Sequence, residues 1–72
     1  MKKQINISGW TLSVINDGYG KEKGLYEIGL WKVGSDIADT IKFEGWLSLD
    51  DVLGYIERII SDPLKVYADL GE

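Results

Sequence analysis

The chain contains no cysteine and no histidine among its 72 residues. Without cysteine it has neither a disulfide framework nor a thiolate metal site, and small secreted domains usually depend on one of the two. A reducing, cytoplasmic location is therefore favoured. Histidine is the side chain best suited to proton transfer near neutral pH, and cysteine is a strong nucleophile. We expect a protein that is not an enzyme and that holds no cofactor and no tightly bound metal.

Long apolar runs are also absent. Met1-Lys2-Lys3 resembles the start of a signal peptide, but Gln4, Asn6 and Ser8 interrupt the apolar segment that would have to follow. No other run approaches the length needed to cross a bilayer. The sequence predicts neither export nor a membrane span.

Positive charge is scarce in the second half of the chain. Residues 1–33 hold five lysines against three carboxylates, whereas residues 34–72 hold nine carboxylates against three basic side chains. Affinity for a phosphate backbone comes chiefly from clustered Lys and Arg, so direct nucleic-acid binding is not expected. A protein partner with a basic surface fits better, although solubility alone also explains an acidic balance.

Alternating apolar and polar residues predict strands at about residues 4–15, 25–33 and 40–47, in one domain spanning residues 1–72. The alternation changes phase at Ser8-Gly9, which indicates either a bulge or the boundary between two short strands. Residues 16–24 are rich in turn formers and predict a hairpin loop.

The alternation also assigns side chains to the two faces of the predicted sheet. One face is expected to meet a helix and the other to remain uncovered. The helix-facing set is Tyr26, Ile28, Leu30, Ile41, Phe43 and Leu47, and the other set is Glu27, Gly29, Trp31, Lys42, Glu44 and Trp46.

A helix is predicted over residues 49–61, because Ser48 and Asp51 form a capping-box pattern and Pro63 cannot continue the helix. Its apolar stripe is expected to be buried, with Tyr55, Glu57 and Arg58 toward the opposite side. The stripe consists of Leu49, Val52, Leu53, Ile56, Ile59 and Ile60. Residues 62–72 are a short tail, in which Asp62-Pro63 could begin a further helical turn carrying Leu64 and Tyr67.

Together these elements predict the α+β class: a small antiparallel meander of three or four strands, followed by one C-terminal amphipathic helix packed on one face. The carboxylate pairs Asp36/Asp39 and Asp50/Asp51 are explained as turn and capping residues rather than as metal or acid–base sites. Trp10 shares its phase with Leu12 and Val14 and is expected in the core.

Trp31 and Trp46 are the candidate contact residues, because the strand pattern places both on the uncovered face. Glu27, Glu44 and Gly29 share that face. The alternative is that the terminal segments cover the two tryptophans with Ile5, Ile7, Val66 or Leu70.

The preferred function is a non-enzymatic protein-interaction module that occupies a partner's surface, such as an inhibitor, an immunity protein or a phage- or mobile-element-encoded modulator. One alternative is a structural protein that forms a homodimer through its open sheet face. Another is a small-ligand or carbohydrate site on the tryptophan face.

Overall fold

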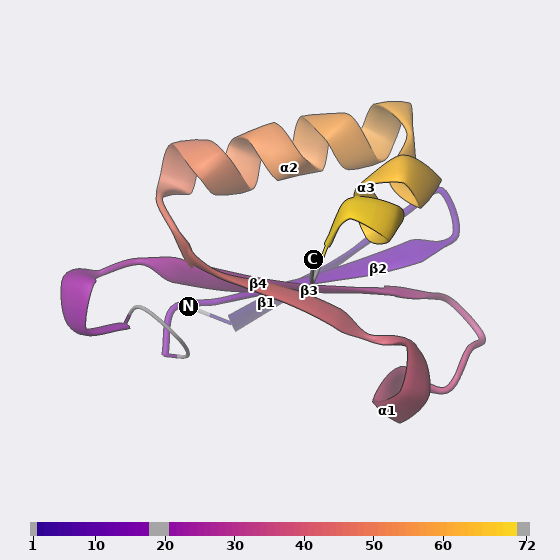
Figure 1. Ribbon diagram of the computed structural model, residues 1–72, viewed down its shortest axis with the longest axis horizontal. Helices are drawn as coiled ribbons and strands as arrows, with labels where there is room; N and C mark the ends of the chain where they lie inside the picture. Colours follow the sequence, from indigo (N-terminus) through magenta and orange to yellow (C-terminus); the bar gives the residue numbers. More distant parts are fainter. Residues whose placement is uncertain (1, 18–20, 71–72) are drawn as a thin grey trace.

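The computed structural model describes residues 2–17 and 21–70. Its centre is an antiparallel sheet in which each strand pairs with the next one in the chain, giving the order β1-β2-β3-β4 (Figure 1). The predicted α+β class and the antiparallel meander are confirmed. The strands are β1 (Lys2–Ile7), β2 (Trp10–Ile15), β3 (Tyr26–Lys32) and β4 (Lys42–Leu47).

Ser8 and Gly9 form a tight turn that divides the first predicted strand into β1 and β2. Both residues have positive φ, 51° and 84°. Two successive positive φ values characterise the type I′ turn, which suits the twist of a two-residue β-hairpin. Of the two interpretations of the phase change, the boundary between two short strands is correct. The predicted loop at 16–24 contains the short 3₁₀ segment η1 (Lys21–Lys23), and residues 18–20 lie outside the described residues.

The described residues contain three helices, α1 (Ile37–Thr40), α2 (Leu49–Ser61) and α3 (Pro63–Asp69), where the sequence predicted one. Asp36 caps α1 by accepting a hydrogen bond from the Ala38 backbone N–H at 3.0 Å, so Thr40 is helical instead of starting a strand. Asp62 caps α3 in the same way, accepting from Lys65 N–H at 3.3 Å. The predicted tail therefore contains a helix of two turns.

Helices α2 and α3 cover one face of the sheet, while α1 lies on the other side (Figure 1). The core lies between these layers and includes Trp10, as predicted. The Trp10 and Tyr67 rings lie 4.9 Å apart, which ties α3 to the start of β2. The core residues are Trp10, Leu12, Val14, Ile28, Leu30, Leu47, Val52, Ile59, Val66 and Leu70.

Helix α2 is rotated relative to the prediction. Val52 and Ile59 are fully buried and Tyr55 packs against the core, whereas Leu53 and Ile60 are 50 % and 61 % exposed. The predicted stripe spans an arc of about 120° at 100° per residue. A single helix lying on a sheet contacts it over a narrower sector, so one flank of the stripe stays in solvent. The expectation that Leu49, Leu53 and Ile60 are buried is wrong, and so is the expectation that Tyr55 lies toward the opposite side.

The predicted capping box at the start of α2 is present. Asp51 N–H donates to Ser48 Oγ and Ser48 N–H donates to Asp51 Oδ2, both at 3.1 Å. Replacing Ser48 with alanine is expected to lower the free energy of unfolding by about 0.5–2 kcal/mol. Urea denaturation measures the change, with Ser61→Ala at the other end of α2 as the control. Equal midpoints for the two variants would show that the cap contributes nothing.

Candidate functional site

Strand β4 contains a β-bulge at Gly45-Trp46. In the register with β3, Ile28 pairs with Glu44 and Tyr26 pairs with Leu47, so two residues of β4 lie opposite Glu27 alone. An extra residue in one strand shifts the alternation of side chains beyond it to the other face. The predicted faces of β4 therefore fail for the residues that precede the bulge and hold for Leu47 beyond it.

Four face assignments are wrong because of this bulge, those of Ile41, Lys42, Phe43 and Glu44. Lys42 pairs with Leu30 and lies on the helix side instead of the uncovered face. Leu47 pairs with Tyr26 and belongs to the core, as predicted. Phe43 pairs with Gly29, however, so Phe43 and its alternation partner Ile41 lie on the face away from α2. Glu44 pairs with Ile28 and lies on the helix side, so it does not share a face with Glu27.

Trp46 occupies the bulge in a left-handed backbone conformation, with φ 61°. For a bulky L-residue this conformation costs on the order of 1–2 kcal/mol, and glycine is the residue that normally takes such a place in a bulge. The indole is 55 % exposed, so more than half of its surface stays in water although the backbone is strained. Lys23 Nζ from η1 lies 6.0 Å from the ring centroid. The backbone thus presents a large aromatic side chain to solvent at the end of β4.

Trp31, the other candidate, lies on the face away from α2 but is only 8 % exposed. It pairs with Thr11 of β2, and α1 packs against its strand. Next to it, a Cβ placed on Gly29 would lie 3.1 Å from Ile41 Cδ1, so the Ile41 side chain extends over β3. Of the two open possibilities for Trp31, exposed or covered, the structure has it covered, and Glu27 and Gly29 are also buried.

The terminal segments do not provide the cover that the alternative interpretation proposed for the tryptophans. Val66 and Leu70 belong to the core with Trp10, on the α2 side of the sheet. The predicted aromatic pair is therefore split: Trp31 lies in a packed cluster beside α1, and Trp46 projects into solvent.

The rest of the face away from α2 is polar. On β1 and β2 this face presents Gln4, Asn6, Thr11 and Ser13, and Thr11 Oγ1 donates a hydrogen bond to Asn6 Oδ1 at 2.9 Å. Exposed apolar side chains on this side include Phe43 of β4 and Ile37 of α1, each about half exposed. The exposed apolar surface of this face therefore involves β4 and α1.

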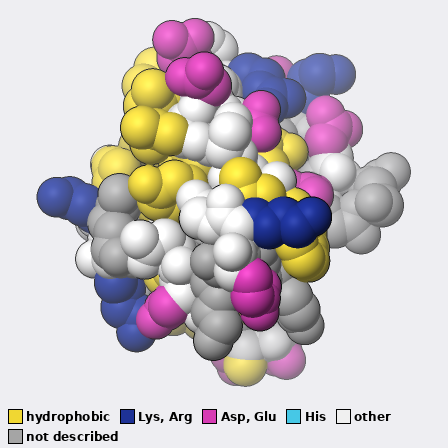
Figure 2. Space-filling view, turned by 90° about the vertical axis from the view of Figure 1, so that its left-hand side faces the viewer, with side chains coloured by type: hydrophobic (Ala, Val, Ile, Leu, Met, Phe, Trp, Pro, Cys, Tyr) yellow, Lys and Arg dark blue, Asp and Glu magenta, His cyan; other side chains and the backbone are white. Residues whose placement is uncertain are grey.

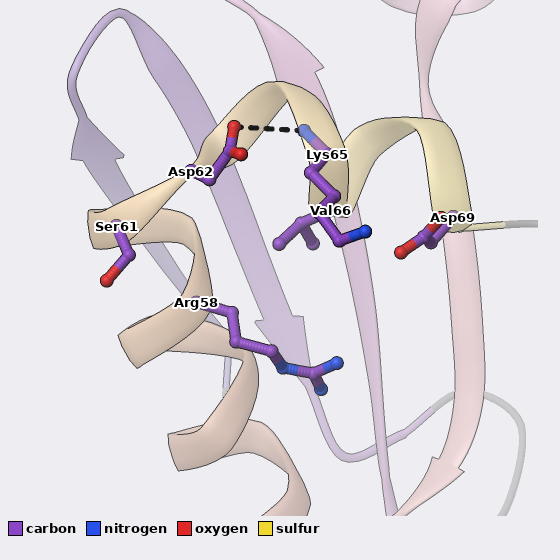
Figure 3. A pocket seen from close by; sticks show the side chains of 6 residues that line it. All are labelled: Arg58, Ser61, Asp62, Lys65, Val66 and Asp69. Atoms are coloured by element: carbon purple, nitrogen blue, oxygen red, sulfur yellow. Dashed lines mark hydrogen bonds between the residues drawn. The ribbon is translucent and has the colours of Figure 1, made fainter.

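A pocket of about 160 Å³ lies between the end of α2 and α3 (Figure 3). Two of its charged side chains already have partners within the chain: Asp62 caps α3, and the Arg58 guanidinium lies 4.3 Å from the Tyr55 ring centroid. In the described part of the chain, no three potential metal ligands lie together. The pocket is lined by Arg58, Ser61, Asp62, Lys65, Val66 and Asp69.

Comparison with known proteins gives no relative. No protein-family model, no curated protein sequence and no solved structure matches this chain. Across residues 2–17 and 21–70, no helix combines the length and apolar character needed to cross a bilayer.

Proposed function

We propose that this chain is a small acidic, non-enzymatic interaction module that binds a partner protein through Trp46, with Phe43 of the same strand contributing. The observation that carries the proposal is the exposed indole of Trp46 on a left-handed backbone. Cytoplasmic inhibitors, immunity proteins and phage- or mobile-element-encoded modulators are the class in which such a module would act.

In the isolated chain the backbone of Trp46 is strained, and more than half of its indole stays in water. Glycine would take the same backbone conformation without steric strain, and an exposed tryptophan contributes little to the core. Strained residues concentrate at functional sites, and tryptophan is among the residues most enriched at binding hot spots. A partner that buries the indole supplies the free energy that the free protein does not gain.

A different protein fits the surface around Trp46 and Phe43 better than a second copy of this chain. Packing two open sheet faces together would bury Gln4, Asn6 and Ser13, and buried polar groups without hydrogen bonds are costly. Strand pairing is disfavoured at both edges of the sheet, because β1 carries Lys2 and Lys3 and β4 carries the bulge.

Affinity capture tests the proposal. Wild-type protein, Trp46→Gly and a control, Val33→Ser, are immobilised and exposed to an extract of the source cells. We expect one protein to be retained by wild type and by the control, and its affinity for Trp46→Gly to fall about thirtyfold or more, corresponding to about 2 kcal/mol. Val33 is a suitable control because it is also half exposed but lies outside the bulge.

Two results would overturn the proposal. One is retention of every captured protein by Trp46→Gly at wild-type affinity. The other is a wild-type dimer in sedimentation equilibrium that Trp46→Gly dissociates, since Trp46 would then contact a second copy.

A further inference from the structure

We infer that α2 carries a second docking surface, which accepts a basic amphipathic helix from another protein. The surface is formed by Leu49, Leu53 and Ile60, called here the α2 stripe. All three side chains are at least half exposed. Figure 2 shows the molecule from the end where α2 begins, with hydrophobic side chains gathered along one side at the level of the helix and acidic side chains above them.

The α2 stripe has the dimensions of a helix-docking site. At 100° per residue its members fall within an arc of about 40°, and Leu49 to Ile60 spans about 17 Å, or three helical turns. Ile56 lies between the stripe and the buried side of α2 and packs against the core, so the stripe is held on a fixed helix. Partner helices recognise such surfaces with apolar anchors spaced three and four residues apart.

The charges beside the α2 stripe determine the kind of partner. Asp50 and Glu57 are exposed and lie on its outer flank, two turns apart. Arg58 is the one basic residue within α2, and it lies on the other side of the helix against the Tyr55 ring. The flank therefore carries negative charge that no cation of α2 compensates. Lysine or arginine beside the apolar seam of a partner helix would complement it.

A second copy of the chain is the less favourable occupant. Two α2 stripes packed against each other would bring Asp50 and Glu57 of one copy toward the same residues of the other. Each copy carries a net charge of −4 at pH 7, so self-association also opposes the overall charge. Repulsion between these like charges disfavours a second copy, whereas the same residues attract the lysine or arginine side chains of a basic helix.

Binding of two synthetic helical peptides tests the inference. Both are 14 residues long with leucine at coiled-coil seam positions; one carries lysine beside the seam and the other glutamate. We expect the lysine peptide to bind wild-type protein at least tenfold more tightly by fluorescence anisotropy. Leu53→Ser should weaken that binding at least tenfold, and Ile60→Ser serves if Leu53→Ser fails to fold by circular dichroism.

Replacing pairs of acidic residues with lysine distinguishes charge beside the α2 stripe from the net charge of the protein. Asp50→Lys/Glu57→Lys should reverse the preference, so that the glutamate peptide binds more tightly. Asp39→Lys/Asp69→Lys makes the same change in net charge on α1 and α3 and should retain the lysine preference. Reversal in both double variants, wild-type affinity in Leu53→Ser, or no binding of either peptide would each overturn the inference. So would a wild-type dimer that Leu53→Ser dissociates. None of these outcomes depends on Trp46.

Discussion

Replacing Trp31 with alanine is expected to lower the free energy of unfolding by about 3–5 kcal/mol, the cost of truncating a buried aromatic residue. The side chain is 8 % exposed although it lies on the face away from α2 and α3. Loss of the Trp31 side chain would leave a cavity beside α1 and Ile41, and the surrounding residues can fill such a cavity only partly. Guanidinium denaturation of the variant measures the effect.

Trp46→Ala is the matched control because it removes the same side chain from an exposed position. We expect its free energy of unfolding to stay within about 1 kcal/mol of the wild-type value, since surface substitutions seldom cost more. If the two tryptophan variants unfolded at the same denaturant concentration, the cluster around Trp31 would not be packed, and the distinction between the two residues would be lost.

Ile59→Ala is expected to cost about 2–5 kcal/mol, because Ile59 is fully buried between α2 and the sheet. In a domain of this size each kcal/mol lowers the melting temperature by roughly 4–8 °C. Ile60→Ala makes the identical chemical change one residue later, where the side chain is 61 % exposed, and should leave the melting temperature nearly unchanged. Thermal unfolding followed by circular dichroism compares the two.

If Ile60→Ala lowered the melting temperature more than Ile59→Ala, α2 would be rotated about its axis by about 100° relative to the structure described. Ile60 would then belong to the core, and the α2 stripe would not be available to a partner. The Ile59/Ile60 comparison thus checks the packing on which the second docking surface depends.

The fold class was predictable because it rests on strong local signals. Ser48 and Asp51 are spaced as a capping box requires, and Tyr26, Ile28 and Leu30 alternate without interruption. The division of the first predicted strand was left open, because a positive-φ turn at Ser8-Gly9 and a bulge there produce the same change of phase.

The faces of β4 were not predictable from alternation alone. A single extra residue at Gly45-Trp46 reverses the parity, so that Leu47 is core while Phe43 is not. Gly45 was the available signal, because a glycine inside a strand often marks a bulge. Strict alternation without the bulge places Trp46 and Trp31 on one face.

The rotation of α2 depends on contacts distant in sequence. Six apolar residues satisfied the helical period, but periodicity does not say which part of a wide stripe meets the sheet. In the structure α3 also packs against α2 and brings Val66 and Leu70 into the core. The strong apolar character of the stripe indicated burial, whereas half of it is exposed and forms a candidate binding surface.

The most direct test of a strained, outward-facing Trp46 is the free energy of unfolding of Trp46→Gly, measured beside wild type and Trp46→Ala. Glycine removes the steric cost of the left-handed conformation, on the order of 1–2 kcal/mol, and this gain offsets the partial burial that is lost with an indole 55 % exposed. We predict that Trp46→Gly is at least as stable as wild type and more stable than Trp46→Ala. A decrease of 2 kcal/mol or more in the free energy of unfolding of Trp46→Gly would contradict this prediction, because the Trp46 side chain would then stabilise the fold of the isolated chain.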